Sequence, residues 1–556
     1  MTSRVLWASV TAALVVLVLL PLGSLVVKSF QTETGPSLAN YVAIGKQTSF
    51  RAATVNSLVF GIAASLIGLV LGAPMAWAVS RTNMPLGGLV RAGVLGAFVT
   101  PGFVLAVAWI LLAGPNAGLL NKLWMTLTGA SRGLLDVYTM TGLVLVSVAS
   151  TFPLAFILVY NTLEMMSGDV EEAARVLGAG TARVTWTITL PLALPAIVAS
   201  LILMFLETII LYGVPAMIGV PARIYVLTTQ LFSLFEWPPK IGVAAAISLP
   251  LLLVTAVLLV IQRRLLAHRS FATNRGKGGR RRPIDLGPLR FVALGLSGLV
   301  LLFTLVLPYA VSVWASVSPV WVRALSAPSF SLDHYRFVLL EFTSGSRSIW
   351  NSLVTAVIAA SIGVVIAVVV AYLTERRIVR HAAWLSFLAM APLVIPGMVF
   401  AVGLFGAYSQ PPLVLYGTLW ILMLAYLTKF LPFAFMSCHA AVQSVYPELE
   451  HAANVLGASR VRALRDITVP MIKAGLLGGW ILVFIPAIKE LSSSILLFTA
   501  PTTVIATAIF DLYQLPSWEG VAALSTILLV LNGVVIAAGN WALGGRLLGR
   551  AGGSGA

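Results

Sequence analysis

EAARVLGAGTARVTWTITLP, residues 172 to 191, returns later in the chain as HAANVLGASRVRALRDITVP, residues 451 to 470, with ten identities in twenty positions and no gap. We call these stretches the first and second cassettes. Their glycines, Gly178 and Gly457, are 279 positions apart, which is close to half of the 556 residues. Both cassettes lie between strongly apolar segments, so the chain is predicted to hold two copies of one membrane unit.

The composition is that of a membrane protein. Hydrophobic residues make up 59% of the chain and charged residues only 10%, whereas a soluble domain has roughly 25% charged residues. A helix needs roughly 20 apolar residues to span a bilayer, and only helices or closed barrels satisfy the backbone in lipid. Twelve such runs predict an all-α protein with six spans in each half: 5 to 27, 53 to 79, 91 to 113, 138 to 160, 192 to 214, 241 to 262, 291 to 314, 348 to 373, 384 to 407, 416 to 438, 472 to 495 and 521 to 545.

Basic residues set the predicted topology. Nine of the 35 Lys and Arg residues lie between 263 and 290, in a hydrophilic linker between a first domain, 1 to 262, and a second, 291 to 556. The positive-inside rule places this linker in the cytoplasm. Alternation from there also places both cassettes and both chain ends in the cytoplasm. Six spans are an even number, so the two repeats are parallel, with a pseudo-twofold axis along the membrane normal.

Shorter repeats support the duplication. Asn56-Ser57-Leu58 recurs as Asn351-Ser352-Leu353, and Pro101-Gly102 recurs as Pro396-Gly397. Both pairs are 295 positions apart instead of 279. The first half therefore carries about 16 extra residues, predicted to lie in the outer segment 114 to 133.

Each cassette is predicted to form a short helix, a turn and a second helix. In the first copy, good helix formers end at Leu177, and Gly178 and Gly180 then break the helix. A loop that only connects two spans would explain one such stretch. Two gap-free copies favour a surface that binds a partner.

The cassettes resemble a family signature. The spacing E-A-A-x3-G-x9-I-x-L-P, complete from Glu172 to Pro191, is similar to that of permease subunits of bacterial binding-protein-dependent ABC importers. The second copy departs at His451 and Val469. The resemblance covers the whole chain as two fused permease domains with a type I importer fold, in a bacterial inner membrane.

The resemblance implies that each cassette forms a coupling helix that docks on one of two copies of a cytoplasmic ATP-binding subunit, with substrate arriving on an extracytoplasmic binding protein. His451 would make the two contacts unequal unless Glu450 supplies the acid. No G-x-x-x-x-G-K-[ST] phosphate loop occurs in the chain, so we expect ATP and Mg to bind the partner, and no enzyme activity or cofactor here. The implied coupling residues are Glu171, Glu172, Ala173, Ala174, Gly178, Glu450, His451, Ala452, Ala453 and Gly457.

Ionisable residues inside spans are candidates for the transport pathway, because each costs about 2.5 to 3.5 kcal/mol on insertion scales. Glu207, Lys489 and Glu490 are the clearest cases. We hypothesise that Glu207 and Glu490 face a pathway between the halves and meet a cationic or metal substrate. The alternative is that they reach interfacial water or pair between helices.

The substrate is less determined. The run from Trp109 to Asn121 and the fused length most resemble ferric-iron permeases, while permeases for thiamine, polyamines or phosphonates share the cassette. The parallel repeat alone would also suit a secondary transporter, but such a carrier needs no docking cassette and usually has more intramembrane acids and bases. No nucleophile–base pair or metal motif indicates a membrane enzyme.

Overall fold

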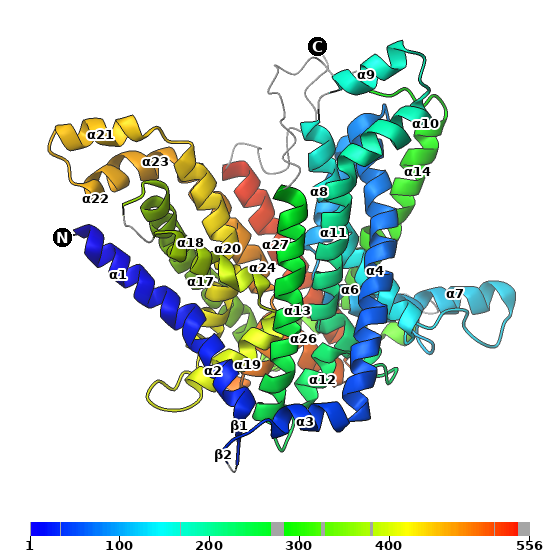
Figure 1. Cartoon of the computed structure of the whole chain (residues 1–556). Helices are drawn as coiled ribbons and strands as arrows, with labels where there is room; N and C mark the ends of the chain where they lie inside the picture. The colour runs from blue at the N-terminus through cyan, green and yellow to red at the C-terminus, as the bar shows by residue number, and fades with distance from the viewer. Residues whose placement is uncertain are drawn as a thin grey trace. The chain divides into compact units, whose positions relative to one another are not determined.

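The computed structural model describes residues 2–33, 35–166, 168–267, 283–323, 329–378, 382–515 and 517–542 (Figure 1). In this part of the chain nine helices are long and apolar enough to cross a membrane, or up to twelve if three bent helix pairs each count as one span. The predicted all-α membrane architecture of about twelve spans is confirmed. Both chain ends and residues 268–282 of the basic linker lie outside the described residues.

The helices form two compact units. The first unit comprises Met1–Thr48, Leu231–Thr255 and Leu332–Gly549. Its elements include one two-stranded antiparallel sheet, β1 with β2. They are α1 (Thr2–Leu14), η1 (Val15–Leu19), α2 (Leu20–Phe30), β1 (Gln31–Thr32), β2 (Gly35–Pro36), α3 (Ala39–Lys46), the start of α13 (Ile241–Ala267), α16 (Asp333–Arg336), η6 (Phe337–Glu341), α17 (Gly345–Glu375), α18 (Ala382–Met390), η7 (Ala391–Val394), α19 (Gly397–Tyr408), α20 (Leu419–Gln443), α21 (Pro447–Val455), α22 (Arg460–Ala463), η8 (Leu464–Thr468), α23 (Val469–Met471), α24 (Lys473–Ile488), α25 (Ser494–Leu497), η9 (Ala500–Thr502), α26 (Ile505–Gln514) and α27 (Trp518–Ala542).

The second unit comprises Ser49–Gln230 and Ala256–Ser331. Its elements are α4 (Thr48–Arg81), α5 (Gly87–Val99), α6 (Gly102–Ala113), α7 (Leu119–Thr128), α8 (Met140–Met165), α9 (Asp169–Val176), α10 (Thr181–Val184), η2 (Thr185–Thr189), α11 (Leu190–Ile210), η3 (Pro215–Gly219), α12 (Leu227–Ser233), the end of α13, α14 (Leu289–Leu301), η4 (Leu302–Val306), α15 (Leu307–Val317) and η5 (Trp321–Arg323). Helix α7 occupies the segment 114–133 in which the extra residues of the first half were predicted.

The first span of each half packs in the unit built mainly from the other half. In the first unit α2 packs along α19, and the Tyr408 hydroxyl donates to the carbonyl oxygen of Val16 at 2.7 Å. In the second unit α15 packs along α6, and the hydroxyls of Thr100 and Tyr309 lie 2.9 Å apart. The compact units therefore divide the chain at other positions than the duplicated halves do. The domain limits 1–262 and 291–556 describe the two repeated halves and stay a prediction.

The third span of each half is not one helix, although a continuous span was predicted for 91–113 and for 384–407. Helices α5 and α6 meet at 100°, and the α18–η7 segment meets α19 at 113°. Proline has no N–H and disfavours the helical conformation of the residue before it. Thr100 before Pro101 accordingly has ψ 127°, and Ile395 before Pro396 has ψ 117°. A second helix then starts at the following glycine.

The predicted span 472–495 also differs, since α24 ends at Ile488 and meets the preceding segment Arg460–Met471 at 78°. The corresponding stretch of the first half, Thr181–Ile210, is one span. A π-turn precedes the proline in both halves: the N–H of Leu190 reaches the carbonyl oxygen of Thr185 before Pro191, and the N–H of Val469 reaches that of Leu464 before Pro470. The halves diverge after the proline, where Ile472 leaves the helical conformation with φ −96° and ψ 9°.

The repeated Asn-Ser-Leu motif has the same structural role in both units. In the second unit Asn56 donates to the carbonyl oxygen of Tyr225 at 2.9 Å, and Ser57 accepts from the N–H of Leu227 at 2.8 Å. In the first unit Asn351 donates to the carbonyl oxygen of Thr503 at 2.9 Å, and Ser352 accepts from the N–H of Ile505 at 2.8 Å. The motif thus ties the second span to the segment before α12 or α26.

We expect Ser352→Ala to destabilise the first unit, because it leaves the buried N–H of Ile505 without its acceptor, at a cost of about 1–3 kcal/mol. Cys438, the chain's one cysteine, is buried in α20 of the same unit. Its reaction with a thiol-specific dye during heating reports unfolding, and the midpoint should fall by about 3–8 °C. Ser444→Ala, at the exposed end of α20, is the matched control. Equal midpoints for both variants would contradict the assigned role.

Candidate functional site

Each cassette forms a helix–turn–helix directly after the fourth span of its half. In the second unit α9 follows α8 and leads through α10 into α11, and in the first unit α21 follows α20 and leads through α22 toward α24 (Figure 1). Acidic residues lie in the first turn of α9 and α21, where carboxylates interact favourably with the helix dipole. The predicted helix, turn and second helix are therefore present in both copies.

The turn in each cassette depends on its glycine. Gly178 has φ +84° and Gly457 has φ +88°, a left-handed conformation that costs other residues energy. The N–H of Ala179 bonds to the carbonyl oxygen of Ala174 at 3.0 Å, and that of Ala458 to Ala453 at 3.0 Å. This 6→1 bond is the Schellman ending of a helix. It fixes where α9 and α21 stop.

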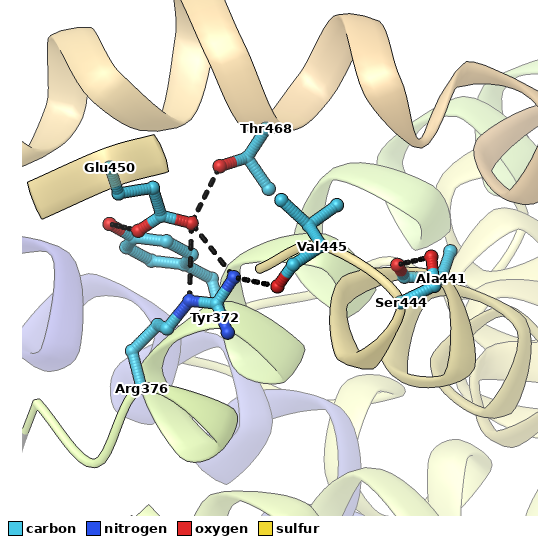
Figure 2. A network of polar contacts seen from close by, with 7 residues as sticks. All are labelled: Tyr372, Arg376, Ala441, Ser444, Val445, Glu450 and Thr468. Atoms are coloured by element: carbon cyan, nitrogen blue, oxygen red, sulfur yellow. Dashed lines mark hydrogen bonds and ion pairs between the residues drawn. The ribbon is translucent and has the colours of Figure 1, made fainter. Parts of the chain in front are cut away.

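A buried ion pair tethers the second cassette to the second span of its half. Glu450 Oε1 accepts hydrogen bonds from Arg376 Nε at 3.1 Å, Arg376 Nη2 at 2.9 Å and Thr468 Oγ1 at 2.7 Å. Its Oε2 accepts from the Tyr372 hydroxyl at 2.9 Å. Arg376 also donates to the carbonyl oxygen of Val445 at 2.9 Å (Figure 2). The network joins the end of α17 to α21 and η8.

The charge on Glu450 is stabilised despite its burial. Removal from water would by itself raise the pKa of this carboxyl group. The hydrogen bonds from Arg376, Thr468 and Tyr372, together with the charge of Arg376, outweigh burial, so the Glu450 pKa lies below its ordinary value. Charge-assisted bonds of this kind are about twice as strong as neutral ones. The cassette helix is therefore held firmly against the span.

The first cassette has a related but looser tether. Arg81 Nη1 lies 3.6 Å from Glu171 Oε2, and Thr189 donates to Glu171 Oε1 at 2.7 Å. Arg81 also donates to the carbonyl oxygen of Met166 at 3.4 Å. Trp77 stands at the repeat position of Tyr372, and its Nε1 finds no acceptor among the described residues. The hydroxyl that bonds the second carboxylate thus has no counterpart in the first.

These tethers revise the prediction for the acidic residues. Glu171 and Glu450 are 5% and 4% exposed, so they point into the protein instead of toward a partner. Glu172 and His451 are exposed, as are Ala173 and Ala452, while Ala174 and Ala453 are half-buried. The difference between the two cassettes, Glu172 against His451, therefore lies at a position that faces outward. The glutamate that faces inward is present in both copies. The arginine partners were not predicted, although Arg81 and Arg376 share the 295-position spacing of the Asn-Ser-Leu motif.

The first helix of each cassette ends in an exposed apolar pair. Val176 and Leu177 are 82% and 87% exposed, and Val455 and Leu456 are both 88% exposed. The four side chains lie at the C-terminal ends of α9 and α21, next to the glycine turns. Exposed apolar side chains at equivalent positions of two tethered helices are typical of a protein-binding surface.

The candidate pathway residues lie apart from the cassettes in their own units. Glu207 is exposed on α11, and Lys489 is half-buried directly after α24. Glu490 is buried and forms an ion pair with Lys429 of α20, at 2.8 Å from Nζ to Oε1. Lys429 was not among the predicted residues. The criterion that selected the other three residues would also have found it, because Lys429 is an ionisable residue inside the predicted span 416–438.

Comparisons with known proteins identify the family. Residues 64–269 and 363–541 match the family described as "Binding-protein-dependent transport system inner membrane component". The chain belongs to this family. The two matched segments correspond to the two halves of the duplication, one cassette in each, so this family member is a fused permease.

Several relatives are named for their substrates. The chain is 23% identical over 453 residues to the ferric transport system permease protein FbpB of Actinobacillus pleuropneumoniae, covering 80% of this chain and 64% of the relative. It is 24% identical over 456 residues to the putative ferric transport system permease protein FbpB 1 of Haemophilus influenzae, covering 81% and 70%. A putative 2-aminoethylphosphonate transport system permease protein PhnV of Salmonella paratyphi A is 27% identical over 230 residues, covering 41% and 84%.

Among solved structures, a bacterial ABC transporter involved in the import of the acidic polysaccharide alginate aligns with 44% of this family member and 88% of its own chain, at 17% identity and a TM-score of 0.36.

We expect Glu450→Gln to lower the free energy of unfolding by about 3 kcal/mol at pH 7, because it leaves the Arg376 charge buried without its partner. The pKa of Glu450 is depressed in the folded state below 4.5. Its stabilisation is thus present above the unfolded-state value and is lost as pH falls through the folded-state value. The difference between wild type and variant should therefore shrink below about pH 4.5, as measured by tryptophan fluorescence on heating.

Glu448→Gln is the matched control, since Glu448 is exposed on the same helix. Its effect should stay within about 0.5 kcal/mol at every pH. A Glu450→Gln difference that grows on acidification would contradict the tether.

Proposed function

We propose that this permease is the translocation subunit of an ATP-driven importer, and that α9 and α21 dock on two copies of a cytoplasmic ATP-binding subunit. The observation that carries the proposal is the exposed Val-Leu pair at the end of each tethered cassette helix. Burying one such pair contributes roughly 3–6 kcal/mol before the costs of association. The exposed side chains Glu172 and His451 would lie on the same contact surface.

In this proposal the tethers transmit movement. When the ATP-binding subunits close, they displace α9 and α21, and the Arg81–Glu171 and Arg376–Glu450 contacts pass the displacement to α4 and α17. ATP and Mg bind the partner, because this chain has no phosphate loop. The cassette ends of both units, the linker and both chain termini face the cytoplasm in this arrangement, and a binding protein delivers substrate at the opposite membrane face.

For the substrate we propose ferric iron. The two relatives named for ferric transport align over 80% and 81% of the chain, whereas the relative named for 2-aminoethylphosphonate aligns over 41%. Import of a phosphonate, thiamine or a polyamine by the same machinery is the alternative. Coupling residues and substrate are separate parts of the proposal and are tested separately.

The docking test replaces both apolar pairs. Val176→Ser with Leu177→Ser, and Val455→Ser with Leu456→Ser, should each reduce co-purification of the native ATP-binding subunit at least tenfold, because the contact loses its apolar area. The partner is identified by mass spectrometry through its phosphate-loop sequence. Leu127→Ser, an 83% exposed leucine on α7, is the control and should leave the complex intact. Wild-type recovery of the ATP-binding subunit in both cassette variants would refute the docking surface.

The substrate test uses the binding protein. Purifying the permease with its native partners from iron-replete cells should recover a binding protein that holds ferric iron, detected by elemental analysis and mass spectrometry. An organic ligand with no iron on that binding protein would refute the ferric assignment and leave the docking proposal unaffected.

A further inference from the structure

The ion pair between Lys429 and Glu490 lies deep in the first unit. Lys429 is the eleventh residue of the 25-residue helix α20, so about 15 Å of helix separates it from the N-terminal end of this span and about 21 Å from the C-terminal end. Glu490 follows the end of α24, and its Oε1 also accepts hydrogen bonds at 2.9 Å from the N–H and the hydroxyl of Ser493. All three donors thus meet one oxygen of the carboxylate. The side chains of Lys429 and Glu490 are 19% and 9% exposed.

The first half of the chain builds the same junction without charge. A Cβ placed on Gly397, at the bend before α19, would lie 2.5 Å from Lys429 Nζ and 3.3 Å from Glu490 Oε1. A Cβ on Gly102, the repeat counterpart at the bend before α6, would lie 3.7 Å from Ser150 Oγ and 3.6 Å from Leu211 Cδ1. Ser150 and Leu211 are the counterparts of Lys429 and Glu490 at the 279-position spacing.

The charges are therefore not required to form this junction. The bends are similar, 100° in the first half and 113° in the second. Charged residues at membrane depth are costly and mark functional positions, and a buried ion pair is often no more stabilising than neutral residues of similar size. A function specific to the second half explains the pair better than a need of the fold.

We propose that Lys429 and Glu490 form a contact site for a cationic substrate during its passage. The inference rests on the proposed import function. Without substrate, the Lys429 ammonium pairs with the Glu490 carboxylate, so the site carries no net charge. An arriving cation binds the Glu490 oxygens and displaces the ammonium, which remains over the Phe430 ring, already 5.5 Å from its Nζ. The ammonium returns when the cation leaves.

The arrangement suits brief contact instead of storage. The described residues contain no group of three His, Cys, Asp or Glu side chains that could hold a metal ion. One carboxylate with a competing ammonium binds a cation weakly, and a conduction pathway needs sites from which an ion can depart. The first half, with Ser150 and Leu211, offers no such carboxylate at its junction.

The chain supplies its own test, because the second half can be given the residues of the first. In vesicles containing the permease with its ATP-binding subunit and binding protein, Lys429→Ser with Glu490→Leu should reduce the maximal rate of ferric iron uptake at least tenfold. The unfolding midpoint of this double variant should stay within about 3 °C of wild type, because the first half folds with these residues. Uptake at the wild-type rate, or a midpoint lowered by about 10 °C or more, would show a structural role and overturn the inference.

A matched glycine pair tests the geometry without removing charge. Gly397→Ala would push Lys429 away from Glu490 and should reduce uptake about threefold or more, whereas Gly102→Ala, whose nearest neighbour is a Val214 methyl at 3.3 Å, should leave uptake within about twofold. Equal uptake in the two variants would overturn the proposed contact. Wild-type vesicles that hydrolyse ATP in response to the loaded binding protein but take up no iron would instead refute the ferric assignment, on which the inference rests.

Discussion

The buried contact between an arginine at the end of a second span and a glutamate in the cassette helix is the constraint on which the cytoplasmic surface depends. In each unit the glutamate lies in the first turn of a short helix. An eight- or nine-residue helix is marginal alone in water. The ion pair, with a threonine from the segment that follows, gives this helix a fixed orientation. This fixed orientation gives the exposed Val-Leu pair of each cassette helix a defined position on the surface.

The duplication makes the differences between halves informative, because each half serves as a reference for the other. The second tether adds the Tyr372 hydroxyl where the first has Trp77, and its Arg–Glu contact is shorter, 2.9 Å against 3.6 Å. The second half carries a charged junction at Gly397 where the first is neutral. The first half carries helix α7 in place of a short loop. Each difference is local, and the Asn-Ser-Leu ties are the same in both.

Prediction from sequence succeeded where a signal was local or repeated. Hydropathy placed the spans, and the glycines at 178 and 457 gave the ends of the cassette helices, since both have positive φ. The spans 91–113 and 384–407 were predicted without a break, but each consists of two helical segments that meet at 100° or 113°. Pro101 and Pro396 were visible in the sequence, but a proline inside an apolar run is compatible with either a kink or a sharp bend, and Pro153 and Pro432 stay within single helices. Packing of the neighbouring helices decides between these outcomes.

The sequence alone determined that this is a duplicated all-helical membrane protein of the permease family with one polar cassette per half, because composition, spacing and residue identity carry that information directly. The tertiary structure decided which residues of each cassette face outward. Glu171 and Glu450 turn inward because Arg81 and Arg376, far away in sequence, offer charges that compensate their burial. The tertiary structure also decided that Glu490 forms an ion pair with Lys429. It decided as well that the first span of each half packs in the compact unit built mainly from the other half. Long-range pairing of this kind depends on how helices meet, which no local pattern of residues encodes.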